Sequence, residues 1–133
     1  MFSLHPRLMA DTAMLADWPL CRVLLMNDSA YPWLILVPRR SGISEITELA
    51  APDQSLLMSE IARASARLRA HVSPDRINVA ALGNMVEQLH IHVIARFTGD
   101  AAWPRPVWGA VPTLPYEPDA LERRVAELRA ALG

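Results

Sequence analysis

Short runs of hydrophobic residues, separated by turn-forming residues, divide much of the chain into segments typical of β-strands. Residues 21–27 (CRVLLMN) and 33–38 (WLILVP) are two such runs, and the Asp, Ser and Pro between them favour a turn. They predict a β-hairpin. Residues 76–82 (RINVAAL) and 89–97 (LHIHVIARF) predict two further strands, with a glycine and an asparagine between them.

Three other segments repeat their hydrophobic residues every three or four positions, as an amphipathic helix does. Residues 52–72 predict the longest helix, and residues 119–132 predict a C-terminal one. Residues 5–17 show the same spacing behind a proline, which a first helical turn tolerates, and predict an N-terminal helix. Residues 99–118 are rich in proline and contain two tryptophans, so we expect an extended loop docked on the fold.

The order of these segments predicts the fold class. Strands that follow one another through short turns pair antiparallel, and here helices precede, separate and follow them. We therefore expect an α+β fold in which helices pack on an antiparallel sheet of about five strands. The length suggests a single domain over residues 1–133.

Composition narrows the classes of function. The 133 residues are 52% hydrophobic and carry a formal charge of -1, so we expect neither disorder nor binding to nucleic acid. We expect no membrane association, because the hydrophobic runs are short. The charged N-terminal residues are unlike a secretory signal, and the single cysteine, Cys21, is expected to be a buried strand residue. These features favour the cytoplasm.

The chain contains no lysine, because all 13 basic residues are arginine. A Walker-type phosphate loop, a Schiff-base lysine and a kinase ATP-binding lysine are therefore excluded. A protein of this composition that handles phosphates has to use histidine, arginine, amide side chains and backbone N–H groups.

Two histidines stand two positions apart in the segment EQLHIHVIAR, residues 87–96. Because strand side chains alternate between faces, Gln88, His90 and His92 would share one face while the residues between them enter the core. Three interpretations of this polar row are open: a structural pair, two ligands of a metal, or a nucleophile with its helper.

The metal interpretation needs a third ligand, because catalytic zinc usually takes three from the protein. No acidic residue follows the pair closely, which leaves His5, His71, Cys21 or a distant acid. We therefore expect neither a metal nor a cofactor.

The nucleophile interpretation fits the residues better. A neutral imidazole attacks phosphorus readily, and once phosphorylated it becomes a good leaving group. His90 would present its Nε2 if the backbone carbonyl of Gln88 accepts a hydrogen bond from its Nδ1–H. His92 would then bond phosphate oxygens or the leaving group, and the amide of Asn84 would add a donor.

The segment LGNMVEQLHIHVIAR resembles the signature of the histidine triad (HIT) superfamily, in which three histidines alternate with hydrophobic residues. VLLMNDSAYPWLILVPRR resembles the family's earlier hairpin, and WPRPVWG resembles the Trp-Pro tail of some members. The resemblance covers about residues 20–108. It implies that His90 is the nucleophile, His92 the third histidine and Asn84 the amide residue that contacts phosphate.

The resemblance also implies a function. The chain would be a nucleotide hydrolase or nucleotidyl transferase that forms a covalent nucleotidyl-histidine. Its substrate would be a nucleoside phosphate ester, anhydride or phosphoramidate, such as a dinucleoside polyphosphate. The protein is expected to be a homodimer, with contacts through the 52–72 helix and residues 93–97.

Further residues are candidates for nucleotide binding. The resemblance implies that Asn27 or Asp28 holds the ribose hydroxyls. Trp33 is as suitable for the core as for a wall against the nucleobase. Asn78 would either make hydrogen bonds within a turn or strand or contact the substrate.

Two positions depart from the family pattern. Gln88 stands where the first histidine belongs, and Met85 stands where a hydroxyl residue is usual. The role expected of Gln88 is mainly that of its backbone carbonyl, so the chemistry could survive. The alternative function is a nucleotide-binding or partner-binding module with little or no catalysis.

Overall fold

A computed structural model describes residues 1–133 and shows a five-stranded antiparallel sheet with the strand order β1-β2-β3-β5-β4. The predicted α+β class and antiparallel sheet are confirmed. The strands are β1 (Thr12–Asp17), β2 (Cys21–Met26), β3 (Trp33–Pro38), β4 (Arg76–Ala80) and β5 (Ile91–Arg96).

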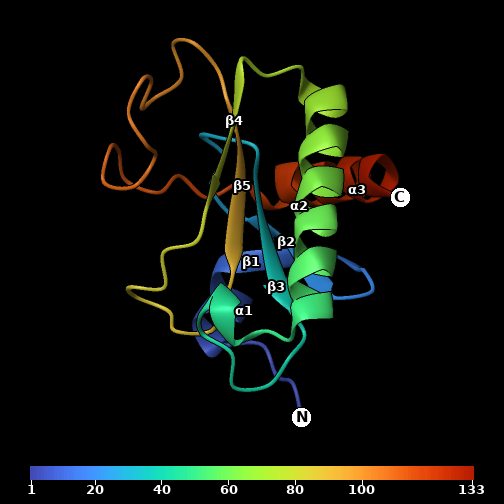
Figure 1. Cartoon of the computed structure of the whole chain (residues 1–133). Helices are drawn as coiled ribbons and strands as arrows, with labels where there is room; N and C mark the ends of the chain where they lie inside the picture. Colours follow the sequence, from blue (N-terminus) through green and yellow to red (C-terminus); the bar gives the residue numbers. More distant parts are fainter.

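The helices are α1 (Pro6–Asp11), the short 3₁₀ helix η1 (Ile46–Glu48), α2 (Ala51–Val72) and α3 (Pro118–Leu132) (Figure 1). In Figure 1, α2 and α3 lie on one side of the sheet, and the long loop before α3 (orange) lies on the other. The predicted long and C-terminal helices are thus confirmed. None of the helices combines the length and the hydrophobicity needed to cross a membrane.

The predicted helix over residues 5–17 is wrong in its second half. α1 ends at Asp11, and Thr12–Asp17 form β1, which pairs antiparallel with β2. The spacing of the hydrophobic residues suits a helix, but the free edge of β2 offers a row of unpaired backbone groups. Tertiary pairing therefore overrides local propensity here.

Two predicted strands are shorter than expected. β4 ends at Ala80 rather than residue 82, and β5 begins at Ile91 rather than residue 89. Gln88 and His90 therefore precede the strand. They lie in a segment outside the strands, in which the N–H of Leu89 donates to the carbonyl of Ile43 at 2.9 Å.

The sheet separates two hydrophobic clusters. The larger one lies under α2 and α3, and the alternate residues Ile91, Val93 and Ala95 of β5 belong to it. The smaller one lies on the opposite face and includes Trp33 and Ile94. Because β5 is an interior strand and every one of its residues is buried, both of its faces need partners.

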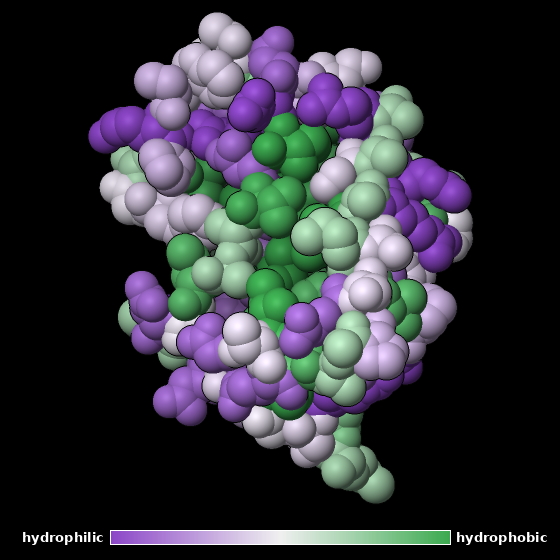
Figure 2. Space-filling model, in the orientation of Figure 1, coloured by the Kyte–Doolittle hydropathy of each residue, from purple (hydrophilic) through white to green (hydrophobic).

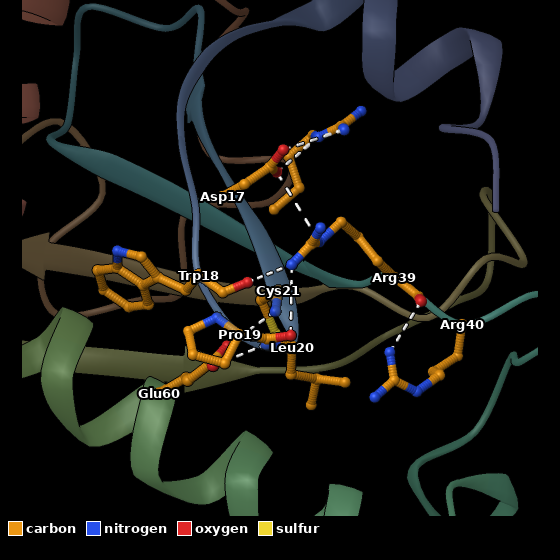
Figure 3. Close-up of polar contacts among 9 residues, drawn as sticks. Asp17, Trp18, Pro19, Leu20, Cys21, Arg39, Arg40 and Glu60 are labelled. Carbon is orange, nitrogen blue, oxygen red and sulfur yellow. Dashed lines mark hydrogen bonds and ion pairs between the residues drawn. The ribbon is translucent and has the colours of Figure 1, made fainter.

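A buried carboxylate fastens α2 to the turn between β1 and β2. Glu60 is only 3% exposed, and its two oxygens accept the backbone N–H groups of Leu20 and Cys21 at 2.9 and 2.8 Å. Figure 3 shows this carboxylate against the turn, with the guanidinium of Arg39 bonded to the carbonyl of Trp18. Burial, and next the charge of Glu60, raise the pKa of the Cys21 thiol, so this cysteine is a core residue.

The free edge of the sheet near α2 is hydrophobic. Figure 2 shows hydrophobic side chains gathered between β4 and α2, and Val79 of β4 and Met58 of α2 are exposed. Residues 93–97, expected at a dimer contact, lie mostly in β5, which is hydrogen-bonded to β3 and β4 on its two edges. β5 therefore presents no free edge, and the free edge on this side of the sheet belongs to β4.

Replacing Glu60 tests the buried fastening. Glu60→Ala leaves two buried N–H groups without acceptors, so we expect the free energy of unfolding to fall by about 3 kcal/mol. Glu60→Gln keeps one acceptor oxygen, and we expect a smaller loss. Urea unfolding followed by circular dichroism measures both, and Glu122→Ala on the exposed face of α3 should change stability by less than about 0.5 kcal/mol. Equal loss in the Ala and Gln variants would contradict the acceptor role.

Candidate functional site

A cleft of about 380 Å³ opens on the face of the sheet opposite α2 and α3. Its walls come from five parts of the chain: α1, the end of β2 with the turn after it, the start of β3, the 82–86 segment before β5, and the loop 107–113. Hydrophobic residues form about half of the lining, and His90 and His92 lie in it. A second, smaller pocket of about 200 Å³ also has His90 in its wall.

The orientation of His90 follows from a contact with the chain that precedes β5. Its Nδ1 lies 2.7 Å from the backbone carbonyl oxygen of Gln88. A carbonyl only accepts, so Nδ1 carries the proton, and Nε2 of the neutral ring keeps its lone pair. This contact is the one that the sequence predicted for a nucleophilic histidine. His90 is 7% exposed, and its Nε2 has no hydrogen-bond partner within the chain.

His92 has the opposite arrangement of protons. The indole Nε1–H of Trp33 donates to its Nδ1 at 3.0 Å. Because an indole nitrogen is only a donor, Nδ1 of His92 accepts, and the neutral ring carries its proton on Nε2. Burial, and next the closeness of His90, lower the pKa of His92 to about 4. His92 is therefore a neutral hydrogen-bond donor near pH 7.

Strand register explains why Trp33 reaches His92. On the paired strands β3 and β5, Ile35 lies opposite His92 and Trp33 lies opposite Ile94. Trp33 is thus the diagonal neighbour of His92 on the same face, within reach of a long side chain. The two imidazoles lie side by side, with ring centroids 4.9 Å apart and planes at 70°.

Trp108 completes the wall beside the histidines. Its ring lies edge-on to His92 at 5.0 Å and to Trp33 at 5.9 Å between centroids. Trp108 belongs to the proline-rich segment that the sequence predicted, over residues 99–118, to be an extended and docked loop; in the structure α3 begins at Pro118. The contacts that fix this loop therefore also determine where Trp108 lies in the cleft.

A buried ion pair fixes the beginning of this loop. Arg96 of β5 donates to both oxygens of Asp100 at 2.8 and 3.0 Å. Asp100 also accepts the backbone N–H groups of residues 97, 102 and 103. Although burial alone would raise it, the hydrogen bonds from Arg96 and these amides lower the pKa of Asp100 to about 2.

The structure brings together only some of the predicted nucleotide-binding residues. Trp33, Asp28 and Asn84 line the cleft. Asn27 does not, because its Oδ1 accepts the N–H of Tyr116 at 2.9 Å. Asn78 lies away from the cleft, where its Oδ1 accepts from the guanidinium of Arg96 at 2.9 Å.

Asp28 and Asn84 differ in how firmly they are held. One oxygen of Asp28 accepts the N–H of Ala30 at 3.0 Å, and the residue is buried. The carboxamide of Asn84 makes no hydrogen bond within the chain and is exposed at the cleft. Met85 beside it is 79% exposed. Its side chain has no hydroxyl group, so this position offers no hydrogen-bond donor to a phosphate.

The side chain of Gln88 does not enter the cleft. Its carboxamide binds the N-terminal segment instead, through the N–H of His5 at 2.8 Å and the carbonyl of Ser3 at 2.9 Å. The expectation that Gln88 shares one face with the two histidines is therefore wrong for its side chain, because the segment before Ile91 is not yet paired in the sheet.

Sequence reasoning missed the contribution of the first helix. Arg7, Leu8 and Asp11 line the cleft, although α1 is far from the histidines in the chain. Arg7 is paired with Asp11 at 3.6 Å. No local signal marks these residues, because only the packing of α1 against the smaller cluster brings them to the cleft.

The remaining candidate metal ligands are separated. His5 accepts the N–H of Arg7 on its ring nitrogen, His71 lies 3.6 Å from Glu127 between α2 and α3, and Cys21 is in the larger core. The structure contains no group of three or more His, Cys, Asp or Glu side chains that could hold a metal ion.

Comparison with known proteins gives one family and several close structures. Residues 7–99 match the model of the HIT domain family. A crystal structure of a histidine triad protein from Marinobacter aquaeolei has 51% sequence identity and a TM-score of 0.96, covering 99% of this chain and 96% of that one. A histidine triad protein from Bradyrhizobium japonicum has 48% identity and a TM-score of 0.95, covering 99% and 98%. A third, from Sinorhizobium meliloti, has 44% identity and a TM-score of 0.90, covering 96% and 93%. No curated protein matches the chain significantly.

Trp33→Phe tests the assignment of the His92 proton. The variant removes the donor to Nδ1, so we expect His92 to populate the Nδ1–H tautomer as well and its pKa to rise from about 4. Imidazole ¹⁵N–¹H correlation spectra recorded as a function of pH measure both. Trp108→Phe is the matched control, since Trp108 contacts His92 without a hydrogen bond, and we expect it to leave the tautomer unchanged. An unchanged tautomer in Trp33→Phe would refute the assignment.

Proposed function

The chain belongs to the HIT domain family, and we propose that it is a nucleotide hydrolase or nucleotidyl transferase whose nucleophile is His90. The observation that carries this proposal is the pair of opposite tautomers in the cleft. His90 offers a lone pair on Nε2, and His92 beside it offers a proton on Nε2. One group can thus attack an electrophile while the other binds the charge that develops.

In the proposed reaction, Nε2 of His90 attacks the α-phosphorus of a nucleoside phosphate ester, anhydride or phosphoramidate in line. A P–N bond to the imidazole forms, and the bond to the leaving group breaks, with its electron pair going to the leaving group. The leaving group takes a proton from water at the open mouth of the cleft. Water then attacks phosphorus and loses a proton to the solvent, which neutralises the hydroxide left by the first step. The P–N bond breaks, His90 departs as a neutral imidazole, and a nucleoside monophosphate is released. The carbonyl of Gln88 stabilises the imidazolium-like ring through the Nδ1–H bond at 2.7 Å.

His92 contributes as a donor rather than as an acid. With a pKa of about 4, the ring is neutral at pH 7 and has no extra proton to transfer. Its Nε2–H can donate a hydrogen bond to a non-bridging phosphoryl oxygen, whose charge increases in the transition state. Asn84 lies in the same cleft and supplies a second neutral donor.

The rest of the cleft suits a nucleoside. Hydrophobic and aromatic side chains, among them Ile35 and Val107, can sandwich a base. Asp28 offers a carboxylate oxygen to ribose hydroxyls at the turn between β2 and β3. Trp33 serves as a wall of the cleft and as the partner of His92.

We also propose that the chain forms a homodimer through the β4 edge. The N–H and C=O groups on the outer edge of β4 are free to pair with a second copy, and hydrophobic side chains flank them. The opposite edge, β1, is partly covered by α3, since Arg129 donates to the carbonyl of Met14 at 2.9 Å. The β4 edge is therefore the better surface for association.

His90→Ala tests the nucleophile. We expect turnover of an adenosine phosphoramidate or a dinucleoside polyphosphate to fall by a factor of at least about 10⁴, because no other group can form the covalent intermediate. Nucleotide affinity should remain within about tenfold, because the walls of the cleft provide the binding.

Rapid quenching of the wild-type reaction with an α-³²P-labelled substrate should trap the label on His90. Label on another residue, or normal turnover by His90→Ala, would overturn the assignment. Tight nucleotide binding without turnover in the wild type would instead identify a binding module.

Val79→Asp tests the dimer. Light scattering of the wild type should give twice the 14.8 kDa chain mass at micromolar concentration. The variant places a charge at the β4 edge, and we expect it to lower the mass to that of one chain. Met14→Asp, an exposed hydrophobic residue on the β1 edge, is the control that should remain dimeric. A wild-type mass of 14.8 kDa would exclude the dimer.

A further inference from the structure

Gln88 makes three hydrogen bonds, and only one of them supports His90. Its backbone carbonyl accepts from Nδ1 of His90 at 2.7 Å. Its side-chain Oε1 accepts the N–H of His5 at 2.8 Å, and its Nε2 donates to the carbonyl of Ser3 at 2.9 Å. The residue therefore joins the support of the nucleophile to a segment more than 80 positions away in the chain.

The two side-chain bonds have the pattern of a β-ladder. In a parallel pair, one residue accepts from residue j+1 through its C=O and donates to residue j−1 through its N–H, and the carboxamide of Gln88 makes the same two bonds around Leu4. Only a primary amide offers a donor and an acceptor side by side. A carboxylate has no donor, and the two nitrogens of a histidine ring point in different directions, so a histidine at position 88 cannot make both bonds.

The segment that Gln88 holds leads directly into a wall of the cleft. Phe2 and Leu4 pack against the smaller hydrophobic cluster, and Leu8 is buried within it. His5 then caps α1, because its Nδ1 accepts the N–H of Arg7 at 3.0 Å. Arg7, Leu8 and Asp11 of this helix face the cleft.

We propose that the side chain of Gln88 is a positioning residue that sets the N-terminal wall of the nucleotide cleft. This role is separate from the support that its backbone carbonyl gives to His90. It rests on the proposed function, in that the wall serves nucleotide binding. It predicts that side-chain substitutions at position 88 weaken substrate binding and leave the chemical step almost unchanged, since every residue at this position keeps the carbonyl.

Five variants, controls included, test the side-chain bonds. Gln88→Ala removes both bonds, and Gln88→Glu keeps the acceptor for His5 while losing the donor to Ser3. Glu87→Ala is the matched control, because the neighbouring Glu87 is exposed and makes no side-chain hydrogen bond. His5→Pro removes the N–H of His5 at a φ of -54°, which proline adopts. His5→Ala, which keeps that N–H, is its reference.

Hydrogen–deuterium exchange decides whether the bonds hold the segment, without any nucleotide. We expect peptides within residues 2–11 of Gln88→Ala to exchange at least about tenfold faster than in the wild type and in Glu87→Ala. Gln88→Glu should lie between them, and His5→Pro should exchange faster than His5→Ala. Peptides from β5 should be unchanged in all variants. Unchanged exchange of the N-terminal peptides in Gln88→Ala would overturn the inference, whatever the activity.

Steady-state kinetics with an adenosine phosphoramidate decide whether the wall serves binding. We expect Gln88→Ala to raise KM about tenfold while kcat stays within about threefold of the wild type. A lower kcat at unchanged KM would mean that the side chain of Gln88 supports His90 rather than substrate binding. Faster exchange of the N-terminal peptides at unchanged KM would mean that this wall does not contribute to binding. Either result would overturn the inference.

Failure of the proposed function gives a different result. If the wild type shows no turnover, the affinity for AMP measured by calorimetry replaces KM. An affinity that falls about tenfold in Gln88→Ala then supports the inference for a binding module. An affinity equal to that of the wild type overturns it.

Discussion

The structure depends on the burial of both faces of the interior strand β5. Its residues Ile91, Val93 and Ala95 belong to the larger core, so the alternating residues must face the other side of the sheet. Two of those, His92 and Arg96, are polar and almost fully buried. A buried polar group without a partner costs free energy, so each needs hydrogen bonds from the layer that covers this face.

These partners also build the cleft. Trp33 gives His92 its donor, and Arg96 binds Asp100, which starts the loop that places Trp108 beside His92. Satisfying two buried polar groups therefore fixes both the proton of one histidine and one wall of the site. Stability and site geometry rest here on the same contacts, so changes in this layer affect both.

The two histidines differ although they have the same residue type and share one cleft. His90 lies just before the strand, where its Nδ1 reaches a backbone acceptor. His92 lies within the strand, where its Nδ1 meets an indole donor. Because one ring bonds to an acceptor and the other to a donor, the two histidines have opposite tautomers. In the proposed reaction this difference makes His90 the nucleophile and His92 the hydrogen-bond donor.

Sequence alone determined the features that depend on local periodicity or on residue chemistry. The hairpin, the two long helices, the docked proline-rich loop and the pairing of His90 with the Gln88 carbonyl all follow from neighbouring residues. Tertiary structure decided the rest, because it depends on contacts between distant segments. Thr12–Asp17 pair with β2 instead of continuing the helix, and the side chain of Gln88 bonds to the N-terminal segment. Asn27 and Asn78 bond to Tyr116 and Arg96 and so do not line the cleft. A buried polar side chain forms hydrogen bonds with the partners that the tertiary structure places near it, and the local sequence does not specify those partners.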